Sequence, residues 1–370
     1  MIPFNKPYLT GKETQYIEEA VKTGKISGNG LFTQKCQNFF EEQYGFKKVL
    51  LTTSCTDALE MCAILANIQV GDEVIMPSFT FVSTAIAFVR QGAKIVFADS
   101  LPDNPNIDIS KIEPLITSKT KAIVPVHYAG IACDMDSIMA LADKYNLLVI
   151  EDAAQAIDSF YKGKALGSIG HMAAFSFHET KNIIAGEGGM IAINDERFIN
   201  RAEIIWEKGT NRAEFFRGEV NKYGWVDTGS SFLPSEVIAA FLWAQIENLQ
   251  FIQKKRISHW NYYHNGLKTW AQKNNIKTMS IPDNATNNGH MFYLVCKSFE
   301  QRSNLIEYLK KESVLAVFHY ISLHSSPYYK DKHDARELIN SDLFTDRLLR
   351  LPMFYELDVE NVVKKIVKYE

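Results

Sequence analysis

"KVLLTTSCTDALEMCAILANI", residues 48–68, joins a short run of branched apolar side chains to a segment with helical spacing. Similar apolar runs, "EVIMPSFT" (73–80), "AKIVFAD" (93–99), "AIVPVHYAG" (122–130) and "LLVIEDAAQ" (147–155), alternate with segments such as "VSTAIAFVRQG" (82–92), "ISKIEPLI" (109–116) and "DSIMALADKYN" (136–146). Strands of this composition are buried on both faces, and helical crossovers join them. The alternation predicts an α/β fold with a mostly parallel, doubly wound sheet, whose ligands bind beyond the C-terminal ends of the strands.

The pattern changes in the second half of the chain. Residues 235–265 have long helical spacing, and from about residue 285 short apolar runs such as "MFYLVCK" (291–297) alternate with helical segments such as "RSNLIEYLKKES" (302–313). We predict a large domain over residues 1–245 and a smaller C-terminal α/β domain over residues 246–370.

Composition and charge argue against several functional classes. The 370 residues are 46% hydrophobic, which supplies a sizeable core, and the net charge of −3 provides no basic stripe for nucleic acid or an anionic membrane. No apolar stretch approaches a membrane span, and the start "MIPFNKPYLTGKE" does not resemble a signal peptide, so a cytoplasmic location is expected. The cysteines form no C-x-x-C pair, which favours reduced thiols and predicts no metal site: Cys36, Cys55, Cys62, Cys133 and Cys296.

Polar and aromatic residues follow the first two predicted strands. Ser54, Cys55 and Thr56 precede a helix, whose first turn has unpaired N–H groups and a positive dipole end that suit a phosphate. Simple N-capping by Ser54 or Thr56 is the alternative. Phe79 and Phe81 lie at the edge of the second strand, where an aromatic ring either joins the core or faces a ligand.

Charged residues follow two later apolar runs. Glu151 and Asp152 end one of them, and "SFHETKN" (176–182) places Lys181 between the apolar run "MAAFSF" and the glycine-rich turn "AGEGG". Each charge alone is most often a surface or capping group. Together with a phosphate site and an aromatic face, they match pyridoxal 5'-phosphate. Its aldehyde forms a Schiff base with lysine, and its ring accepts electrons when an aspartate keeps the pyridine nitrogen protonated. Asp152 suits that role.

Three blocks carry a family resemblance. "EDAAQA" (151–156), "FSFHETKN" (175–182) and "GEGGMIAIND" (186–195), in this order and spacing, resemble the sugar-nucleotide aminotransferases, which are fold-type-I pyridoxal-phosphate enzymes. The resemblance runs nearly end to end, and it implies a homodimer with shared active sites. Further blocks resemble family members that aminate C4 of a dTDP-linked keto-sugar: "IPFNKP" (2–7), "GDEVIMPSFTFVSTA" (71–85), "VPVHYAG" (124–130), "EKGTNR" (207–212), "FFRG" (215–218) and "AVFHYISLH" (316–324).

The resemblance assigns roles by position. Lys181 would hold the cofactor's aldehyde, Asp152 would pair with the pyridine nitrogen, and Gln155 would reach the ring hydroxyl. Phe81 would lie against the ring. The phosphate would contact Ser54, Cys55, Thr56 and Ser176. His178 would shape the pocket, with proton transfer as the alternative.

The resemblance also implies where the substrate lies. Many relatives read G-Y-N-Y-R where this chain reads "GSSFL" (229–233), so Ser231 stands where an asparagine reaches the partner subunit's cofactor phosphate. Cations of "EKGTNRAEFFRG" (207–218) would grip the substrate's diphosphate, or else form a solvated loop. The glycine segment "SGNG" (27–30) would lie beside the sugar or simply turn the chain, and "HYISLH" (319–324) would form pocket wall. The predicted substrate residues are Gly28, Asn29, Lys208, Asn211, Arg212, Arg217, His319 and Tyr320.

The implied reaction is a two-stage ping-pong transamination. L-Glutamate would leave as 2-oxoglutarate, and a nucleotide-linked 4-keto-6-deoxyhexose would then be aminated for surface polysaccharide, at C4 and with the galacto configuration. Amination at C3 and a gluco product remain alternatives. A sugar dehydratase of this fold has histidine in place of the lysine, and a non-catalytic relative would lack the lysine or the carboxylate. A nicotinamide oxidoreductase would require G-x-G-x-x-G after the first strand, which reads otherwise here.

Overall fold

The large sheet follows the predicted parallel pattern. The computed structural model describes residues 1–369. The sheet has seven strands in the order β1 (Lys48–Thr52), β9 (Gly189–Ile193), β8 (Met172–Ser176), β5 (Leu148–Asp152), β4 (Thr120–Ile123), β2 (Glu73–Pro77) and β3 (Lys94–Ala98). Strands β8, β5, β4, β2 and β3 pair in parallel, whereas β9 is antiparallel to both of its neighbours. The α/β prediction with a mostly parallel sheet is confirmed.

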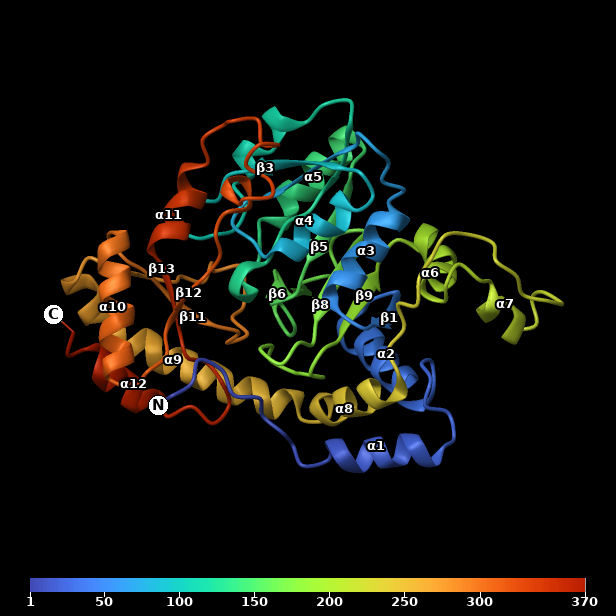
Figure 1. Ribbon diagram of the computed structural model, residues 1–370, viewed down its shortest axis with the longest axis horizontal. Helices are drawn as coiled ribbons and strands as arrows, with labels where there is room; N and C mark the ends of the chain where they lie inside the picture. Colours follow the sequence, from blue (N-terminus) through green and yellow to red (C-terminus); the bar gives the residue numbers. More distant parts are fainter. Residues whose placement is uncertain (370) are drawn as a thin grey trace.

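Both faces of this sheet are buried. Successive strand residues enter two separate cores, so Val149 packs in one and Ile150 in the other. Helices α2 (Leu31–Tyr44), α5 (Met135–Tyr145) and α8 (Glu236–Ile246) supply side chains to the first core, and α3 (Cys55–Leu65), α4 (Val82–Val89) and α6 (Ile199–Trp206) to the second (Figure 1). Helix α1 (Glu13–Lys22) packs outside α8. Double winding explains why these strands read as continuous apolar runs.

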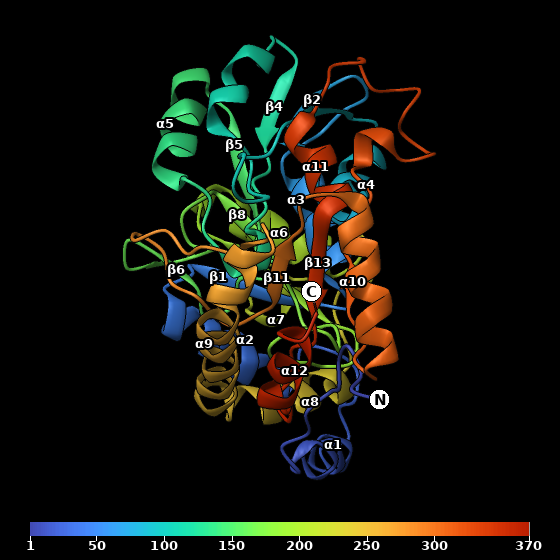
Figure 2. The ribbon, with the colours of Figure 1, turned by 90° about the vertical axis from the view of Figure 1, so that its left-hand side faces the viewer.

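The C-terminal part of the chain, called the small domain below, has its own antiparallel sheet. Its order is β10 (Lys277–Thr278), β11 (Phe292–Val295), β13 (Leu348–Leu351) and β12 (Val317–Phe318). Around it lie α9 (Leu249–Lys273), α10 (Phe299–Lys311), α11 (Ile339–Arg347) and α12 (Val359–Ile366) (Figure 2). Helix α9 begins in the core of the large sheet at Leu249 and reaches this third core at Trp260. A domain boundary after residue 245 remains a proposal.

Two further segments matter for the site. A small hairpin, β6 (Phe160–Tyr161) and β7 (Lys164–Ala165), follows β5. Residues 207–231 form an arm that carries α7 (Arg212–Phe216) and projects away from the large sheet (Figure 1). Phe216 and Trp225 of this arm are 69% and 83% exposed. Large aromatic side chains in such exposed positions are typical of a surface that contacts another molecule.

The N-terminal segment, residues 1–5, contacts both the C-terminal part of the chain and the loop that follows β8. Ile2 forms a parallel bridge with Val314, and the guanidinium of Arg350 lies 4.8 Å from the ring centre of Phe4. The amide of Asn5 donates a hydrogen bond to the carbonyl oxygen of Glu179 at 3.1 Å. The N-terminal segment therefore joins the small domain to the loop that contains Lys181.

All five cysteines are free thiols. Within residues 1–369, no helix is long and apolar enough to span a bilayer. Over the same residues, no group of three or more His, Cys, Asp or Glu side chains is arranged to hold a metal ion.

Candidate active site

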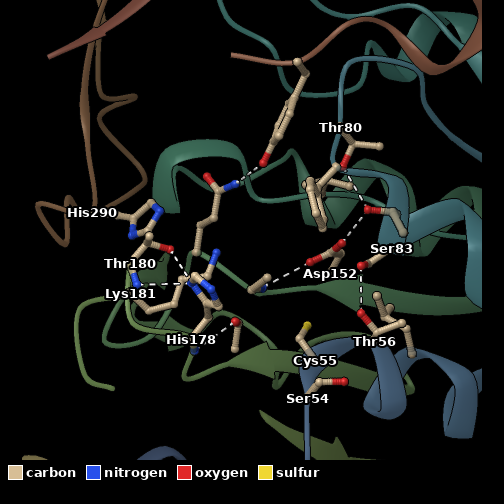
Figure 3. A pocket seen from close by; sticks show the side chains of 18 of the residues that line it. Ser54, Cys55, Thr56, Thr80, Ser83, Asp152, His178, Thr180, Lys181 and His290 are labelled. Carbon is tan, nitrogen blue, oxygen red and sulfur yellow. Dashed lines mark hydrogen bonds between the residues drawn. The ribbon is translucent and has the colours of Figure 1, made fainter. Parts of the chain in front are cut away.

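A cavity of 470 Å³ lies at the C-terminal ends of β1, β2, β5 and β8 (Figure 3). The small domain closes it from the other side. It collects most of the residues that the sequence singles out: Ser54, Cys55, Thr56, Phe81, Asp152, Gln155, Ser176, His178, Lys181, His319 and Tyr320. Parallel strands all end at the same edge of a sheet, which is why residues so far apart in the sequence meet here.

The turn before α3 forms one end of the cavity. Ser54 is the N-cap, and its hydroxyl accepts a hydrogen bond from the backbone N–H of Asp57 at 3.1 Å. The hydroxyls of Thr56 and Ser83 lie 2.7 Å apart, so α4 supports the same turn. Capping and anion binding are compatible at this position, because the cap uses one lone pair of Ser54, and Cys55 and Thr56 of the first turn also line the cavity.

Gly189 holds the turn from beneath. A Cβ atom at this position would lie 2.5 Å from the backbone nitrogen of Cys55 and 2.5 Å from the carbonyl carbon of Ser54. Backbone atoms cannot rotate away as a side chain can. The glycine-rich turn after Lys181 therefore includes a residue whose missing side chain lets β9 pass directly under the turn.

We expect Gly189→Ala to weaken cofactor binding about tenfold or more, because the added methyl must displace the Ser54–Cys55 backbone, and such overpacking costs about 1–3 kcal/mol. Equilibrium titration of the apoprotein with pyridoxal 5'-phosphate measures the change. Gly224→Ala is the matched control, since its added Cβ would meet no atom within 4 Å. Equal affinity in the two variants would show that the turn tolerates the displacement.

Asp152 faces the cavity from the end of β5. One carboxylate oxygen accepts a hydrogen bond from the Thr84 hydroxyl at 2.7 Å, and the other accepts one from the N–H of Ala154 at 3.1 Å. Thr84 in turn lies 2.9 Å from the hydroxyl of Thr80. Burial raises the pKa of Asp152, whereas both hydrogen bonds and the charge of Lys181 oppose that shift. A buried carboxylate of this kind is stabilised by a cation such as a protonated pyridine nitrogen.

Glu151 points to the opposite face of the strand. Its carboxylate accepts hydrogen bonds from the N–H groups of Gly167, Ile169 and Gly170, at 2.6 to 2.9 Å. It also lies 2.8 Å from Nε2 of His127. These contacts fix the loop between β7 and β8. The two consecutive carboxylates of β5 thus have separate surroundings, and Glu151 does not face the cavity.

Lys181 lies in the loop that follows β8 and lines the cavity (Figure 3). Its backbone N–H donates to the carbonyl oxygen of His178 at 2.9 Å, which closes a tight turn. Burial lowers the pKa of the Lys181 amine, and the positive charge of Arg350 acts in the same direction, whereas Asp152 opposes it. A lowered pKa increases the neutral fraction of the amine, which is the nucleophilic form.

Other predicted cofactor contacts are held in fixed orientations. Gln155 accepts a hydrogen bond from the N–H of Ala129 at 2.6 Å and reaches the Tyr320 hydroxyl at 3.4 Å. Nδ1 of His178 accepts a hydrogen bond from the N–H of Thr180 at 3.2 Å and lies 2.9 Å from the Thr180 hydroxyl. Neither role proposed for His178 is decided by this arrangement.

Aromatic rings form part of the wall. Phe81 is 56% exposed and lines the cavity beside Tyr320, with ring centres 6.0 Å apart. Phe79, the other aromatic of the pair singled out from the sequence, is buried in the core of the small domain. Of these two rings, Phe81 is thus the one available to a ligand. The nearby His319 lies with Nδ1 2.6 Å from the Tyr128 hydroxyl, which restricts the orientation of its ring.

The remaining predicted substrate residues, and the predicted cofactor residue Ser231, do not line this cavity within the single chain. They are Gly28, Asn29, Lys208, Asn211, Arg212, Arg217 and Ser231. A Cβ on Gly28 would lie 2.3 Å from the carbonyl oxygen of Pro234, so the protein's own backbone occupies the space its side chain would fill. Arg217 is paired with Glu203 and Glu219, each at 2.7 Å. The backbone of Ser231 forms an isolated antiparallel β-bridge with Glu207. Their substrate and cross-subunit roles remain predictions.

Several cavity residues were not singled out from the sequence, among them Thr84, His290 and Arg350. Thr84 binds Asp152, but a threonine in an apolar helical segment gives no sign of facing a carboxylate. His290 and Arg350 come from the small domain, one just before β11 and one on β13. No local motif marks either of them, because only the packing of the two sheets brings them to Lys181.

These features are those of a fold-type-I aminotransferase: a phosphate turn, a strand-end carboxylate and a lysine after the neighbouring strand. Pyridoxal 5'-phosphate fits this donor set, because the helix N-terminus at Ser54 suits its phosphate, the Asp152 carboxylate suits a protonated pyridine nitrogen and the Lys181 amine suits its aldehyde. Spr1654 of Streptococcus pneumoniae, solved in its PMP and PLP forms, shares the fold. The PMP form has a TM-score of 0.92 over 100% of this chain and 98% of its own, at 24% identity.

The chain belongs to the DegT/DnrJ/EryC1/StrS aminotransferase family, whose sequence profile matches residues 7–368. GDP-perosamine synthase of Escherichia coli O157:H7 is 33% identical over 98% of this chain and 96% of its own length. The spore coat polysaccharide biosynthesis protein SpsC of Bacillus subtilis is 32% identical over 99% and 96%. The chain is therefore a sugar aminotransferase, and it uses pyridoxal 5'-phosphate.

Proposed function

We propose that this aminotransferase moves the amino group of L-glutamate to C4 of a nucleotide-linked 4-keto-6-deoxyhexose. The products would be dTDP-4-amino-4,6-dideoxygalactose and 2-oxoglutarate, and the amino sugar would enter surface polysaccharide. The observation that carries the transfer chemistry is the single cavity that contains both Lys181 and Asp152. The choice of sugar rests on the sequence blocks at 2–7, 71–85 and 316–324.

We assign a separate role in the reaction to each of the main polar residues of the cavity. When bound, pyridoxal 5'-phosphate draws electrons from the carbon that carries the amino group. We assign its phosphate to the turn at Ser54 and Thr56 and its pyridine nitrogen to Asp152. Lys181 would hold the aldehyde carbon between turnovers. While substrate occupies the site, its free amine would carry the proton between the substrate carbon and the cofactor.

A GDP-linked sugar is the second candidate. GDP-perosamine synthases appear among the relatives of this chain, at 33% and 36% identity. The cofactor residues are equally suited to either nucleotide, because the difference lies in the base. The product configuration and the aminated carbon likewise depend only on the wall that faces the sugar.

The reverse reaction tests these alternatives. Purified enzyme would be mixed with dTDP-4-amino and dTDP-3-amino sugars of both configurations and with a GDP-4-amino sugar, and bleaching of its visible absorbance would be followed. We expect the fastest bleaching with dTDP-4-amino-4,6-dideoxygalactose. Preference for a 3-amino, gluco or GDP-linked compound would replace the proposed substrate. A colourless protein that ignores added cofactor would contradict the transfer chemistry itself.

We propose that the arm at residues 207–231 serves the active site of a second copy of the chain. The arm projects away from its own cavity, and its exposed Tyr223 and Trp225 suit a contact between subunits (Figure 1). Arg212 lies at the start of α7, and its guanidinium is 5.2 Å from the ring centre of Phe216. Its side chain is exposed, so it can bind a diphosphate without first breaking an ion pair. Arg217 would first have to leave Glu203 and Glu219.

We expect Arg212→Ala to raise the KM for the keto-sugar about tenfold to a hundredfold, because a charge-assisted hydrogen bond to phosphate contributes roughly 1.5–3 kcal/mol. Arg217→Ala should have a smaller effect, since its guanidinium is already paired. The glutamate half-reaction involves no nucleotide, so its rate should not change. Stopped-flow measurement of each half-reaction tests this, with the surface variant Arg197→Ala as control. Equal losses in both halves would place Arg212 at the donor site instead.

A further inference from the structure

Asn182 directly follows Lys181, yet no step of the proposed chemistry uses it. Its side chain is buried, and its amide nitrogen donates hydrogen bonds to the side-chain oxygen of Gln253 at 2.8 Å and to the backbone carbonyl oxygen of Asn288 at 2.8 Å. A backbone carbonyl can only accept, so it fixes which side of the Asn182 amide is nitrogen. The amide oxygen therefore faces Nδ1 of His290, at 2.8 Å.

This contact fixes the tautomer of His290. An amide oxygen has no hydrogen to donate, so Nδ1 of the imidazole carries the proton. Burial holds the pKa of His290 well below its usual range, and the charges of Lys181 and Arg256 act in the same direction, so the ring is neutral near pH 7. A neutral imidazole has a single N–H, and Nε2 therefore has a free lone pair.

The backbone around His290 is held as firmly as its ring. The buried guanidinium of Arg256, on α9, donates to the carbonyl oxygens of Gly289 at 3.1 Å and His290 at 2.7 Å. The N–H of His290 donates to the side-chain oxygen of Asn288 at 3.0 Å, and the nitrogen of that side chain donates to the carbonyl oxygen of Gln155 at 2.8 Å. The segment is thus tied both to α9 and to the loop after β5, and its geometry is set before a ligand arrives.

Nε2 of His290 is available to a ligand in the cavity. The ring lines the cavity, and Figure 3 shows His290 and Lys181 on one side of it and Asp152 on the other. Among residues 1–369, Nε2 makes no hydrogen bond, and it is not enclosed by the protein, so its lone pair is open to the cavity. The cationic side chains of this cavity, Lys181 and Arg350, are donors. His290 supplies the acceptor that they cannot.

The two substrates differ in the donors that they bring to this acceptor. The amine of glutamate is the group that reacts, and its carboxylates accept hydrogen bonds rather than donate them. A keto-sugar has hydroxyl groups, one of them on the carbon next to the carbonyl that reacts. Lys181 acts at the reacting carbon, and His290 is bonded to the neighbouring Asn182. The hydroxyl nearest to His290 is therefore the one beside that carbon.

We propose that His290 accepts a hydrogen bond from the hydroxyl next to the reacting carbonyl and so selects a hydroxylated keto-sugar over its deoxy analogue. Asn182 is a positioning residue, because it keeps the proton on Nδ1 and the lone pair on Nε2. This inference rests on the proposed function, since it names the sugar group that the same site recognises. In a 4-keto-6-deoxyhexose, this hydroxyl is the one on C3.

Binding of the keto-sugar can be measured without turnover, because a ketone does not react with enzyme that contains the aldehyde form of the cofactor. Calorimetric titration gives the Kd of the dTDP-linked 4-keto-6-deoxyhexose and of its 3-deoxy analogue. We expect the analogue to bind wild-type enzyme about tenfold more weakly, since it leaves Nε2 without a donor. In His290→Phe the two sugars should bind equally, and the glutamate half-reaction should keep its rate.

Two results of these measurements would overturn the proposal on the binding side. One is equal affinity of the two sugars for wild-type enzyme, and the other is a preference for the hydroxylated sugar that persists in His290→Phe. Equal slowing of both half-reactions in His290→Phe would also contradict it, because His290 would then act on Lys181 rather than on the sugar.

The nitrogen chemical shifts of His290 report its tautomer in wild-type enzyme. In protein labelled with nitrogen-15 histidine, the signals that are missing from His290→Gln belong to His290. We expect a proton on Nδ1, and we expect the Nε2 signal to move when the hydroxylated sugar binds but not when the deoxy analogue binds. A proton on Nε2, or the same movement with both sugars, would refute the proposal.

Asn182→Ala tests the positioning role. Without the amide oxygen, the proton of His290 is no longer held on one nitrogen, so the NMR spectrum should show both tautomers. The difference in affinity between the two sugars should narrow as well. Asn304→Ala, at an exposed position of α10, is the matched control. A single unchanged tautomer with an unchanged difference in affinity would exclude this role for Asn182.

Failure of the proposed function gives a different pattern from failure of this inference. If wild-type enzyme binds neither dTDP-linked sugar, the proposed nucleotide is wrong, and the comparison is repeated with the GDP-linked sugar and its 3-deoxy analogue. A proton on Nε2 of His290 overturns the inference, whichever nucleotide the enzyme uses.

Discussion

Lys181→Ala should yield a colourless enzyme whose turnover is reduced about a thousandfold or more. The amine would hold the cofactor covalently and would then move the proton, so its loss removes both the nucleophile and the general base. The side chain lines a cavity rather than the core, and its amine forms no ion pair with a carboxylate among residues 1–369. The Tm of the apoprotein should therefore stay close to the wild-type value.

Absorbance spectra, single-turnover rates and thermal unfolding would be measured on the same preparations. Lys162→Ala is a matched control, because Lys162 is an exposed lysine on the β6–β7 hairpin that pairs with Asp136. Visible absorbance and turnover retained by Lys181→Ala would exclude Lys181 as the residue that holds the cofactor. A large fall in Tm for the apoprotein would show instead that the side chain supports the fold.

Asp152→Asn should leave the cofactor bound and coloured but slow proton removal by about a hundredfold or more. Asparagine has the shape of aspartate and can still accept a hydrogen bond from the N–H of Ala154 and pair with the hydroxyl of Thr84. It cannot hold a protonated pyridine nitrogen through an opposite charge, so the ring accepts electrons less readily.

The isotope effect on the glutamate half-reaction separates chemistry from binding. With glutamate deuterated at the α-carbon, Asp152→Asn should show a larger isotope effect than wild-type enzyme, because proton removal becomes slower than the other steps. Asp136→Asn, at an exposed carboxylate, is the control. A wild-type rate in Asp152→Asn would assign the pyridine nitrogen to a different residue.

The parts of the site that sequence reasoning located depend on local order along the chain. Ser54, Asp152 and Lys181 each follow an apolar run, and the geometry of a parallel sheet places the ends of such runs together. Asp152 was preferred to Glu151 because the pyridine nitrogen pairs with an aspartate. The structure shows the physical reason, because neighbouring residues of a strand point to opposite faces.

The parts that sequence reasoning did not locate depend on contacts between distant segments. Arg350 reaches the cavity only because the small sheet packs over the ends of the large one. Gly28 packs against the carbonyl oxygen of Pro234, a contact between distant segments that its glycine-rich surroundings do not indicate, and its role beside the sugar stays a prediction. Arg212 and Arg217 lie on an arm whose direction no local pattern encodes, so their distance from the cavity of the same chain could not be foreseen.

The contacts between the N-terminal segment and the C-terminal part also affect the order in which the protein folds during translation. Ile2 and Phe4 are synthesised long before their partners Val314 and Arg350. The phosphate turn, Asp152 and Lys181 belong to segments that can fold while translation continues. The wall of the cavity that carries Arg350 is completed only after β13 has been synthesised. A nascent chain can therefore form the segments that carry Asp152 and Lys181 before the opposite wall of the cavity exists.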